Sequence, residues 1–315
     1  MDAIIVLLFL LSILIVLKGA DWFIESAISI SNKLGIPKII IGATIVSFAT
    51  VAPEFFVSTI AAYLGHTEMT VGNALGSVIC NTGLILGFVI AVRSRSPIEN
   101  KFYMKSFFMV IAVLMLILFS YNGVITAFNG LFLLFLFIGF IYYNYKYQTN
   151  IWNDENASTN RNKLVHIRKE LIYFVLGAIF VIIGSRLLVY SGVELAEIIG
   201  VPEMIIALTL VAFGTSAPEL VTAIAAVVKK HHDLSIGNII GANLMGLTLI
   251  FGVAPFFRDI PILAQSLYYD IPAMFVLIFV VVIPALVLKR LERWMGILLI
   301  ILYIGYILGL IMWYV

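Results

Sequence analysis

Two stretches of this sequence are nearly the same: Ala43-Thr-Ile-Val-Ser-Phe-Ala-Thr-Val-Ala-Pro-Glu54 and Ala207-Leu-Thr-Leu-Val-Ala-Phe-Gly-Thr-Ser-Ala-Pro-Glu219. Each places a carboxylate directly after a proline, inside an otherwise apolar segment. A proline has no backbone donor, and its ring clashes with the carbonyl four residues before it. The pattern therefore predicts two broken helices, each with an acidic side chain beside the break.

The composition is that of an integral membrane protein. Of the 315 residues, 63% are hydrophobic and 11% are charged, and the mean hydropathy is +1.13. Soluble domains carry about 25% charged residues. The apolar runs are long and unbroken, which favours spanning helices over the alternating strands of a barrel. The sequence predicts an all-α protein embedded in membrane lipid, and no stretch suggests nucleic-acid binding.

The apolar runs predict ten transmembrane helices. They cover about 3–30, 38–64, 69–92, 104–121, 124–145, 169–198, 203–228, 234–256, 269–288 and 294–314. The long hydrophilic segment 146–168 separates five helices in residues 1–145 from five in residues 169–315.

The two groups of five helices repeat each other. A shift of 165 positions brings Gly19 onto Gly184, Pro53-Glu54 onto Pro218-Glu219, and Gly72-Asn73 onto Gly237-Asn238. Because the matches fall on Gly, Pro, Glu and Asn, chance similarity of apolar sequence does not explain them. Five is an odd number of spans, so the second group enters the membrane upside down. The chain is predicted to consist of two inverted five-helix repeats.

Lysine and arginine gather in alternate loops. The loops after odd-numbered spans and their flanks carry most of these residues, including Lys146, Lys229 and Arg290, whereas the other loops carry essentially only Arg258. Cytoplasmic loops are the ones enriched in Lys and Arg. We therefore expect a multi-pass protein of the cell membrane with a cytoplasmic linker at 146–168 and both termini outside.

Oxygen ligands gather around the two proline-containing stretches. They are the carbonyls freed at about Ala49 and Gly214 with their neighbours near Ser47 and Ala212, the hydroxyls of Thr50, Thr215 and Ser216, and the carboxylates of Glu54 and Glu219. Such hard ligands suit Na⁺ and Ca²⁺ rather than transition metals. A charge at the bilayer centre costs at least about 2.5–3.5 kcal/mol, so two of them indicate a function. We expect Glu54 and Glu219 to face each other and hold a cation.

The helices that follow these stretches add small and amide residues. Ser77 and Asn81 are four residues apart, so both can point at the same ion from one helix face. The spacings Gly72-xxx-Gly76 and Gly237-xxx-Gly241 allow neighbouring helices to approach closely.

These motifs resemble those of the cation/calcium antiporter superfamily, in particular prokaryotic members of its sodium/calcium exchanger branch. The resemblance covers essentially the full length and rests on Gly214-Thr-Ser-Ala-Pro-Glu219, Gly237-Asn-Ile-Ile-Gly241 and their weaker first copies. It implies that the first and sixth helices slide past a central core. It also implies cation ligands at Ser47, Thr50, Glu54, Ser77, Asn81, Ala212, Thr215, Ser216 and Glu219.

Four positions depart from the pattern of the superfamily. Val51 and Ala242 stand where Ser is usual, Ala49 stands where Gly is usual, and Gly246 stands where similar members often carry Asp. Two bidentate carboxylates with nearby carbonyls still approach the roughly 6–8 oxygens that Ca²⁺ takes. A sodium position that depends on the missing hydroxyls is expected to be weaker.

Charge counting favours antiport. Two carboxylates give the empty site a charge of about −2, which is costly to carry across a membrane. One Ca²⁺, two Na⁺ or two H⁺ neutralise the site equally, so a carrier that moves only when neutral exchanges one cargo for another. The motif favours Na⁺ as the counter-ion and the lost hydroxyls favour H⁺.

We therefore predict a secondary-active Ca²⁺/Na⁺ antiporter that works as a monomer by alternating access. The alternatives are a channel and an antiporter that exchanges H⁺ for Ca²⁺ or another divalent cation. No His-Glu-x-x-His motif is present in the sequence, so an intramembrane enzyme is not expected, and neither is a resident cofactor. Asp21 and Arg186 occupy equivalent repeat positions. They are either gating residues or charges that reach water near a helix end.

Overall fold

A computed structural model of the chain describes residues 2–33, 47–92, 96–97, 100–152, 168–228 and 232–314. The first part of the predicted second span (38–46) and most of the predicted linker (153–167) lie outside these residues. In chain order the elements are α1 (Asp2–Lys33), α3 (Ser47–Leu64), α4 (Thr67–Cys80), η2 (Asn81–Leu86), α5 (Gly87–Val92), β1 (Ser96–Pro97), α6 (Asn100–Ser120), β2 (Val124–Ile125), α7 (Ala127–Trp152), α8 (Arg168–Ile199), α9 (Glu203–Ile206), η3 (Ala207–Val211), α10 (Ala212–Thr215), α11 (Ala217–Val228), α12 (His232–Met245), η4 (Gly246–Ile250), α13 (Phe251–Val253), η5 (Ala254–Phe256), β3 (Ile260–Pro261), η6 (Ser266–Asp270), α14 (Ile271–Leu288), β4 (Arg290–Leu291) and α15 (Arg293–Tyr314).

The described part of the chain is a helical membrane protein. Eight of its helices are long and apolar enough to cross a membrane, and the bent pair Glu203–Thr215 and Ala217–Ile224 raises the number to nine. A shorter apolar helix, Val51–Leu64, covers most of the described part of the predicted second span. The predicted all-α, multi-pass membrane class is confirmed.

Two spans form the centre of the molecule. In the apolar windows of Thr67–Val92 and Ser235–Phe256, 78% and 83% of the residues are buried, compared with 33% for the window in α1. A spanning helix buried on all sides lies inside the helix bundle, whereas a helix buried on one side faces lipid. The span from α4 to α5 and the span from α12 to α13 are therefore surrounded by the other helices.

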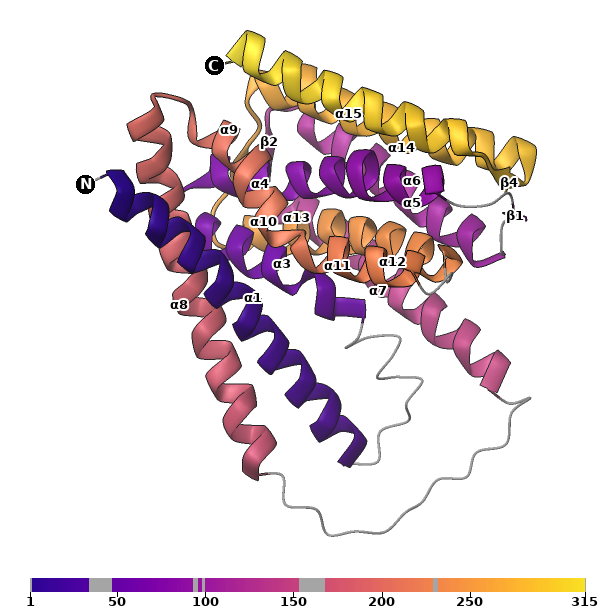
Figure 1. Cartoon of the computed structure of the whole chain (residues 1–315), viewed down its shortest axis with the longest axis horizontal. Helices are drawn as coiled ribbons and strands as arrows, with labels where there is room; N and C mark the ends of the chain where they lie inside the picture. Colours follow the sequence, from indigo (N-terminus) through magenta and orange to yellow (C-terminus); the bar gives the residue numbers. More distant parts are fainter. Residues whose placement is uncertain are drawn as a thin grey trace.

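α1 and α8 pack side by side along much of their length, and their Lys33 and Arg168 ends extend away from the remaining helices (Figure 1). Small residues bring the two backbones together. A methyl group on Gly19 would lie 2.7 Å from the backbone nitrogen of Val181, and one on Gly184 would lie 2.9 Å from that of Val16. Small residues at helix contacts allow this approach in membranes.

Both central spans contain a short π-helical segment. η2 begins at Asn81 and η4 begins at Gly246, which are separated by the 165-position shift of the sequence repeat. A π segment adds a residue to the helical turn and often marks a functional site. These segments were not predicted from the sequence.

The helix break predicted near Pro218 is present. α10 ends at Thr215 and α11 begins at Ala217, with a 43° bend between the two helical parts. Pro218 is the second residue of α11, in the first turn of that helix, where a backbone N–H has no helical partner to lose.

The break predicted at Pro53 is wrong for the described residues. Pro53 lies inside α3, which is continuous from Ser47 to Leu64. A membrane helix tolerates an internal proline when its neighbours satisfy the freed backbone groups.

Two short antiparallel strand pairs connect distant parts of the chain. β1 pairs with β4, and β2 pairs with β3. β1 and β3 begin 164 positions apart, and β2 and β4 begin 166 positions apart, so both separations are close to the repeat shift. In Figure 1, β1 and β4 lie near one end of α14 and α15, and β2 lies near their other end.

α4 packs against η3 through Gly72 and Gly76. The contact at Gly76 gives a stability prediction. A methyl group on Gly76 would lie 2.6 Å from the carbonyl oxygen of Leu208 and 2.7 Å from Cβ of Ala212. Gly76→Ala is therefore expected to destabilise the protein by about 1–3 kcal/mol, measured as a lower midpoint of thermal unfolding in detergent.

Gly305→Ala is the matched control for Gly76→Ala. A methyl group placed on Gly305 would have no neighbouring atom of the described residues within 4 Å, and Ala has the higher helix propensity. An equal loss of stability in both variants would contradict the packing argument.

Candidate cation site

A small cavity lies between the central helices. Its lining residues are Val51, Glu54, Ala74, Ser77, Val78, Asn81, Glu219, Ala242, Asn243, Gly246 and Ile250. The cavity has about 10 Å³ of space for the centre of a water-sized sphere. That is near the volume needed for one water molecule, so the cavity accommodates a single small ion.

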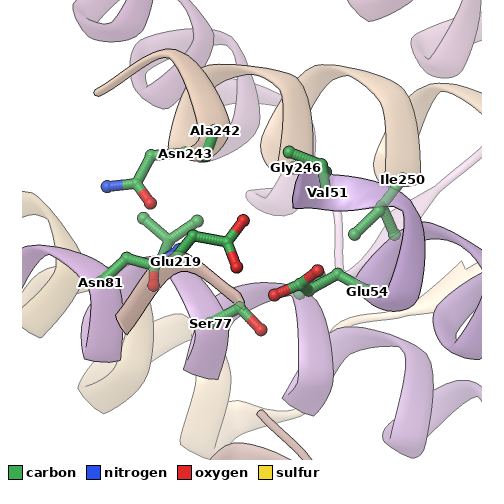
Figure 2. A pocket seen from close by; sticks show the side chains of 11 residues that line it. Val51, Glu54, Ser77, Asn81, Glu219, Ala242, Asn243, Gly246 and Ile250 are labelled. Atoms are coloured by element: carbon green, nitrogen blue, oxygen red, sulfur yellow. The ribbon is translucent and has the colours of Figure 1, made fainter. Parts of the chain in front are cut away.

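Glu54 and Glu219 come from distant parts of the chain to this cavity. Glu54 belongs to α3 and Glu219 to α11, and their side chains are 3% and 1% exposed. Figure 2 shows the two carboxylates pointing toward one another, with the Ser77 hydroxyl beside them. Two carboxylates at close range repel each other, and burial strengthens that repulsion. A cation between them relieves it.

One hydrogen bond to Glu54 joins the two halves of the sequence. The hydroxyl of Ser216, at the break between α10 and α11, donates to Oε1 of Glu54 at 3.0 Å. The second oxygen, Oε2, is buried and has no hydrogen-bond partner among the described residues. Because a buried unpartnered carboxylate oxygen is costly, Oε2 is available to a ligand.

Asn73 of α4 holds the surrounding backbone. Its Nδ2 donates to the backbone oxygen of Glu54 at 3.3 Å and to Oγ of Ser58 at 2.9 Å. Its Oδ1 accepts a hydrogen bond from Thr215 at 3.0 Å. One buried amide therefore connects α3, α4 and α10 and fixes the backbone that carries Glu54.

Val51 makes the two sides of the site unequal. By the repeat shift, Val51 corresponds to Ser216, the residue that donates to Glu54. Val51 is 2% exposed and lines the cavity near Gly246 and Ile250 (Figure 2). A valine has no hydroxyl, so it cannot give Glu219 the bond that Ser216 gives Glu54.

Two amides line the cavity on the side away from Val51 (Figure 2). Asn81 and Asn243 are 3% and 1% exposed, and the Oδ1 atom of each has no hydrogen-bond partner among the described residues. The other end of Asn243 is fixed, because its Nδ2 donates to Thr82 at 2.8 Å. A methyl group placed on Gly246 would have no neighbouring atom of the described chain within 4 Å, so the cavity is open there.

The donor set fits a hard cation. The cavity is lined by two carboxylates, two amide oxygens and the Ser77 hydroxyl, and all of these ligands are oxygens. Na⁺ and Ca²⁺ prefer oxygen ligands, whereas transition metals favour imidazole and thiolate. The geometry therefore supports a site for a cation of this kind at the centre of the bundle.

The sequence matches a known family along both halves. The model of that family, described as sodium/calcium exchanger protein, matches residues 4–146 and again residues 169–312. The chain belongs to the sodium/calcium exchanger family. This family consists of membrane cation transporters and not of enzymes.

Known proteins are similar to this chain along almost their whole length. The chain is 32% identical over 306 residues to an uncharacterized membrane protein of Methanocaldococcus jannaschii, covering 94% of each chain. It is 26% identical over 345 residues to the sodium/calcium exchanger MaX1 of Methanosarcina acetivorans, covering 96% of this chain and 97% of MaX1. Among solved structures, the sodium-calcium exchanger NCX_Mj matches with a TM-score of 0.65 at 26% identity, covering 98% of this chain and 99% of NCX_Mj.

Several of the residues that the sequence analysis predicts to bind the cation line the cavity of this protein. Glu54, Glu219, Ser77 and Asn81 do so, and Ser216 reaches it through its bond to Glu54. Thr215 is not among the lining residues, and its hydroxyl oxygen lies 3.5 Å from that of Ser77. The side chains of Ser47 and Thr50 lie outside the described residues.

Three further predicted residues are not among the lining residues of the cavity. The carbonyl oxygen of Ala212 accepts hydrogen bonds from the Ser216 backbone at 3.0 Å and from Thr215 at 3.3 Å. Asp21 is exposed and lies 4.0 Å from Lys18, and Arg186 is exposed on α8. Neither of these two charged residues is among the lining residues of the cavity.

Sequence reasoning missed Asn73 and Asn243. The sequence marks Asn73 only as part of a repeated Gly-Asn pair, and it did not lead us to predict a role for Asn243. A signal for Asn243 exists, because the two copies differ there: the repeat shift aligns it with Val78. A polar residue that replaces an apolar one in a buried helix of an exchanger indicates a site.

Proposed function

We propose that this protein exchanges Ca²⁺ for Na⁺ across the membrane, with Glu54 and Glu219 as the central cation ligands. One observation carries the proposal: two buried carboxylates from the two family-matched segments line one small cavity. Its oxygens at Glu54 Oε2, Asn81 and Asn243 lack hydrogen-bond partners among the described residues. These are the atoms that would coordinate a cation.

The proposed ligand set includes side chains and backbone. It consists of Glu54, Glu219, Ser77, Asn81, Thr50, Thr215, Ser216 and the backbone at Ser47 and Ala212, to which we add Asn243. The carboxylates supply up to four oxygens and the remaining groups complete the roughly 6–8 that Ca²⁺ takes. Carrying two buried negative charges across the membrane without a bound cation is costly. Exchange of one cargo for another follows.

We further propose ten spans arranged as two inverted five-helix halves, residues 1–145 and 169–315. The strand pairs support this arrangement, because about 165 positions separate β1 from β3 and β2 from β4, so exchanging the two halves converts the pair β1–β4 into the pair β3–β2. The equivalent π segments η2 and η4 support it as well. In this arrangement residues 146–168 are a cytoplasmic linker, both termini lie outside the cell membrane, and the protein works as a monomer.

Purified protein in sealed proteoliposomes tests the exchange. Radiolabelled Ca²⁺ uptake into sodium-loaded vesicles is expected to stop when the Na⁺ gradient is removed, and to be unaffected by K⁺. Ca²⁺ uptake driven by a pH gradient alone would show that the counter-ion is H⁺ and not Na⁺. Ca²⁺ flux without any counter-ion would indicate a channel and overturn antiport.

H⁺/Ca²⁺ exchange is the second candidate. The observation in its favour is the pair Val51 and Ala242, which line the cavity without hydroxyl groups. Two protons on the carboxylates neutralise the site without further oxygens, whereas two Na⁺ ions need a ligand shell.

Restoring these hydroxyls separates the two candidates. If Na⁺ is the counter-ion, the double variant Val51→Ser with Ala242→Ser is expected to lower the Na⁺ concentration for half-maximal Ca²⁺ exchange by about 3- to 10-fold, because one added oxygen ligand for each Na⁺ contributes about 0.5–1.5 kcal/mol. Uptake at varied internal Na⁺ measures this shift. Val78→Thr, which adds a hydroxyl at another lining position, controls for polarity alone. An unchanged Na⁺ dependence in the double variant would favour H⁺.

A further inference from the structure

A second cavity lies between α1 and α8, toward the ends at Lys33 and Arg168 that project from the bundle (Figure 1). It is lined by Trp22, Glu25, Ser26, Ser29, Lys169, Glu170 and Tyr173. It has about 230 Å³ of space for the centre of a water-sized sphere, compared with about 10 Å³ in the cation site. This cavity is therefore suited to a group of several atoms rather than to a single ion.

The charges around this cavity are balanced between its two walls. Glu170 forms an ion pair with Lys33, with Oε1 and Nζ 2.6 Å apart, which links the ends of α8 and α1. Glu25 of α1 and Lys169 of α8 contribute one further charge of each sign. A ligand that carries one positive and one negative group complements both walls, whereas a simple anion or cation complements only one.

The aromatic rings narrow the chemistry of the positive group. Trp22 and Tyr173 meet edge to face, with ring centroids 5.9 Å apart. The ammonium of Lys18 lies 5.7 Å from the Trp22 ring, and that of Lys169 lies 5.9 Å from the Tyr173 ring. Because each ring already has a cation over it, the rings do not form a cage for a quaternary ammonium. A primary ammonium, with N–H donors for Glu25 and the two serines, fits better.

An apolar surface continues from the cavity along α8. Ile172, Leu176, Ile179 and Ile183 follow Lys169 at helical spacing and are 50%, 38%, 43% and 49% exposed. Residues three and four apart share a helix face. In a membrane protein such a stripe faces lipid tails, and Trp, Tyr and Lys near a helix end lie at headgroup level. The cavity is thus continuous with an acyl-chain surface.

We propose that this cavity binds a phospholipid with a phosphoethanolamine headgroup. The ammonium of the lipid donates to Glu25, its phosphate accepts from Lys169, and its acyl chains lie along Ile172, Leu176 and Ile179. The bound lipid contacts both α1 and α8. The site is separate from the cation site, and its occupation does not depend on which ions the protein exchanges.

Native mass spectrometry of the purified full-length protein tests the site. The probes are phosphatidylethanolamine, phosphatidylcholine and phosphatidylglycerol with the same acyl chains. The ethanolamine lipid is expected to bind about 3- to 10-fold more tightly than the other two, because partly exposed charged contacts contribute modestly. Glu25→Gln and Lys169→Gln are each expected to remove this preference.

Glu197→Gln, an exposed carboxylate near the other end of α8, is the matched control and is expected to keep the preference. Glu25 and Lys169 are exposed, so their variants are expected to fold, and circular dichroism checks this. Equal binding of the three lipids by the wild type would overturn the proposal, as would an undiminished preference in both variants. Tighter binding of phosphatidylglycerol would show an anion site instead.

Discussion

Glu219→Gln is expected to lower Ca²⁺ exchange in proteoliposomes by about 100-fold or more. The substitution keeps the shape of the side chain and removes one of the two negative charges in the cavity. Charge-assisted contacts contribute about 1.5–3 kcal/mol each, and a loss of about 3 kcal/mol corresponds to roughly 100-fold in affinity. Glu54→Gln is expected to have the same effect, because both carboxylates line the cavity.

The same variants are expected to gain stability when Ca²⁺ is absent. In the wild type two buried carboxylates repel each other, and the glutamine removes that repulsion. Ca²⁺ at about 100 times its dissociation constant stabilises the wild type by about 2.7 kcal/mol, and this gain disappears in the variants. Thermal unfolding with and without Ca²⁺ measures both effects. Glu197→Gln is the charge-matched control for both measurements. Full Ca²⁺ exchange by Glu219→Gln would exclude the proposed central site.

Asn73→Ala is expected to lower the free energy of unfolding by about 2–4 kcal/mol. The amide makes three buried hydrogen bonds, to the Glu54 backbone, to Ser58 and to Thr215. Its removal leaves these groups unsatisfied at membrane depth, where water does not replace it, at about 1–3 kcal/mol for each group that finds no new partner. Thermal unfolding in detergent gives the size of the loss.

Asn73→Ala is also expected to weaken Ca²⁺ exchange, because the backbone of Glu54 loses its anchor. Asn144→Ala, at a partly exposed position of α7, is the matched control and is expected to change stability by less than about 0.5 kcal/mol. If the two variants lose the same stability, the buried network around Asn73 does not support the site.

The carboxylates of the site could be identified from the sequence because a charged residue in an apolar run is rare and stands out by type alone. Glu54 and Glu219 could be selected as candidate ligands without knowing how the helices pack. Ser77 and Asn81 were predicted from their spacing on one helix, and both line the cavity. Residue type and local spacing are properties of the chain itself.

Asn73 and Asn243 required the folded molecule. Their partners are remote, since Asn73 meets Thr215 and Asn243 meets Thr82 across 142 and 161 positions. The central helices are buried on nearly all sides, so hydrophobic periodicity does not indicate which face of each helix meets which neighbour. The π segments at Asn81 and Gly246 shift the side chains further from the positions that a regular helix predicts.

The sequence by itself determined the membrane class, the internal repeat and the two acidic motifs, because composition and the types of residue at repeated positions carry that information. Only the tertiary structure decided that α3 runs unbroken through Pro53 and that Ser216 binds Glu54 from the other half of the chain. The physical reason is that a membrane helix satisfies its polar groups through whichever neighbours it packs against. Those neighbours are set by the fold and not by adjacent sequence.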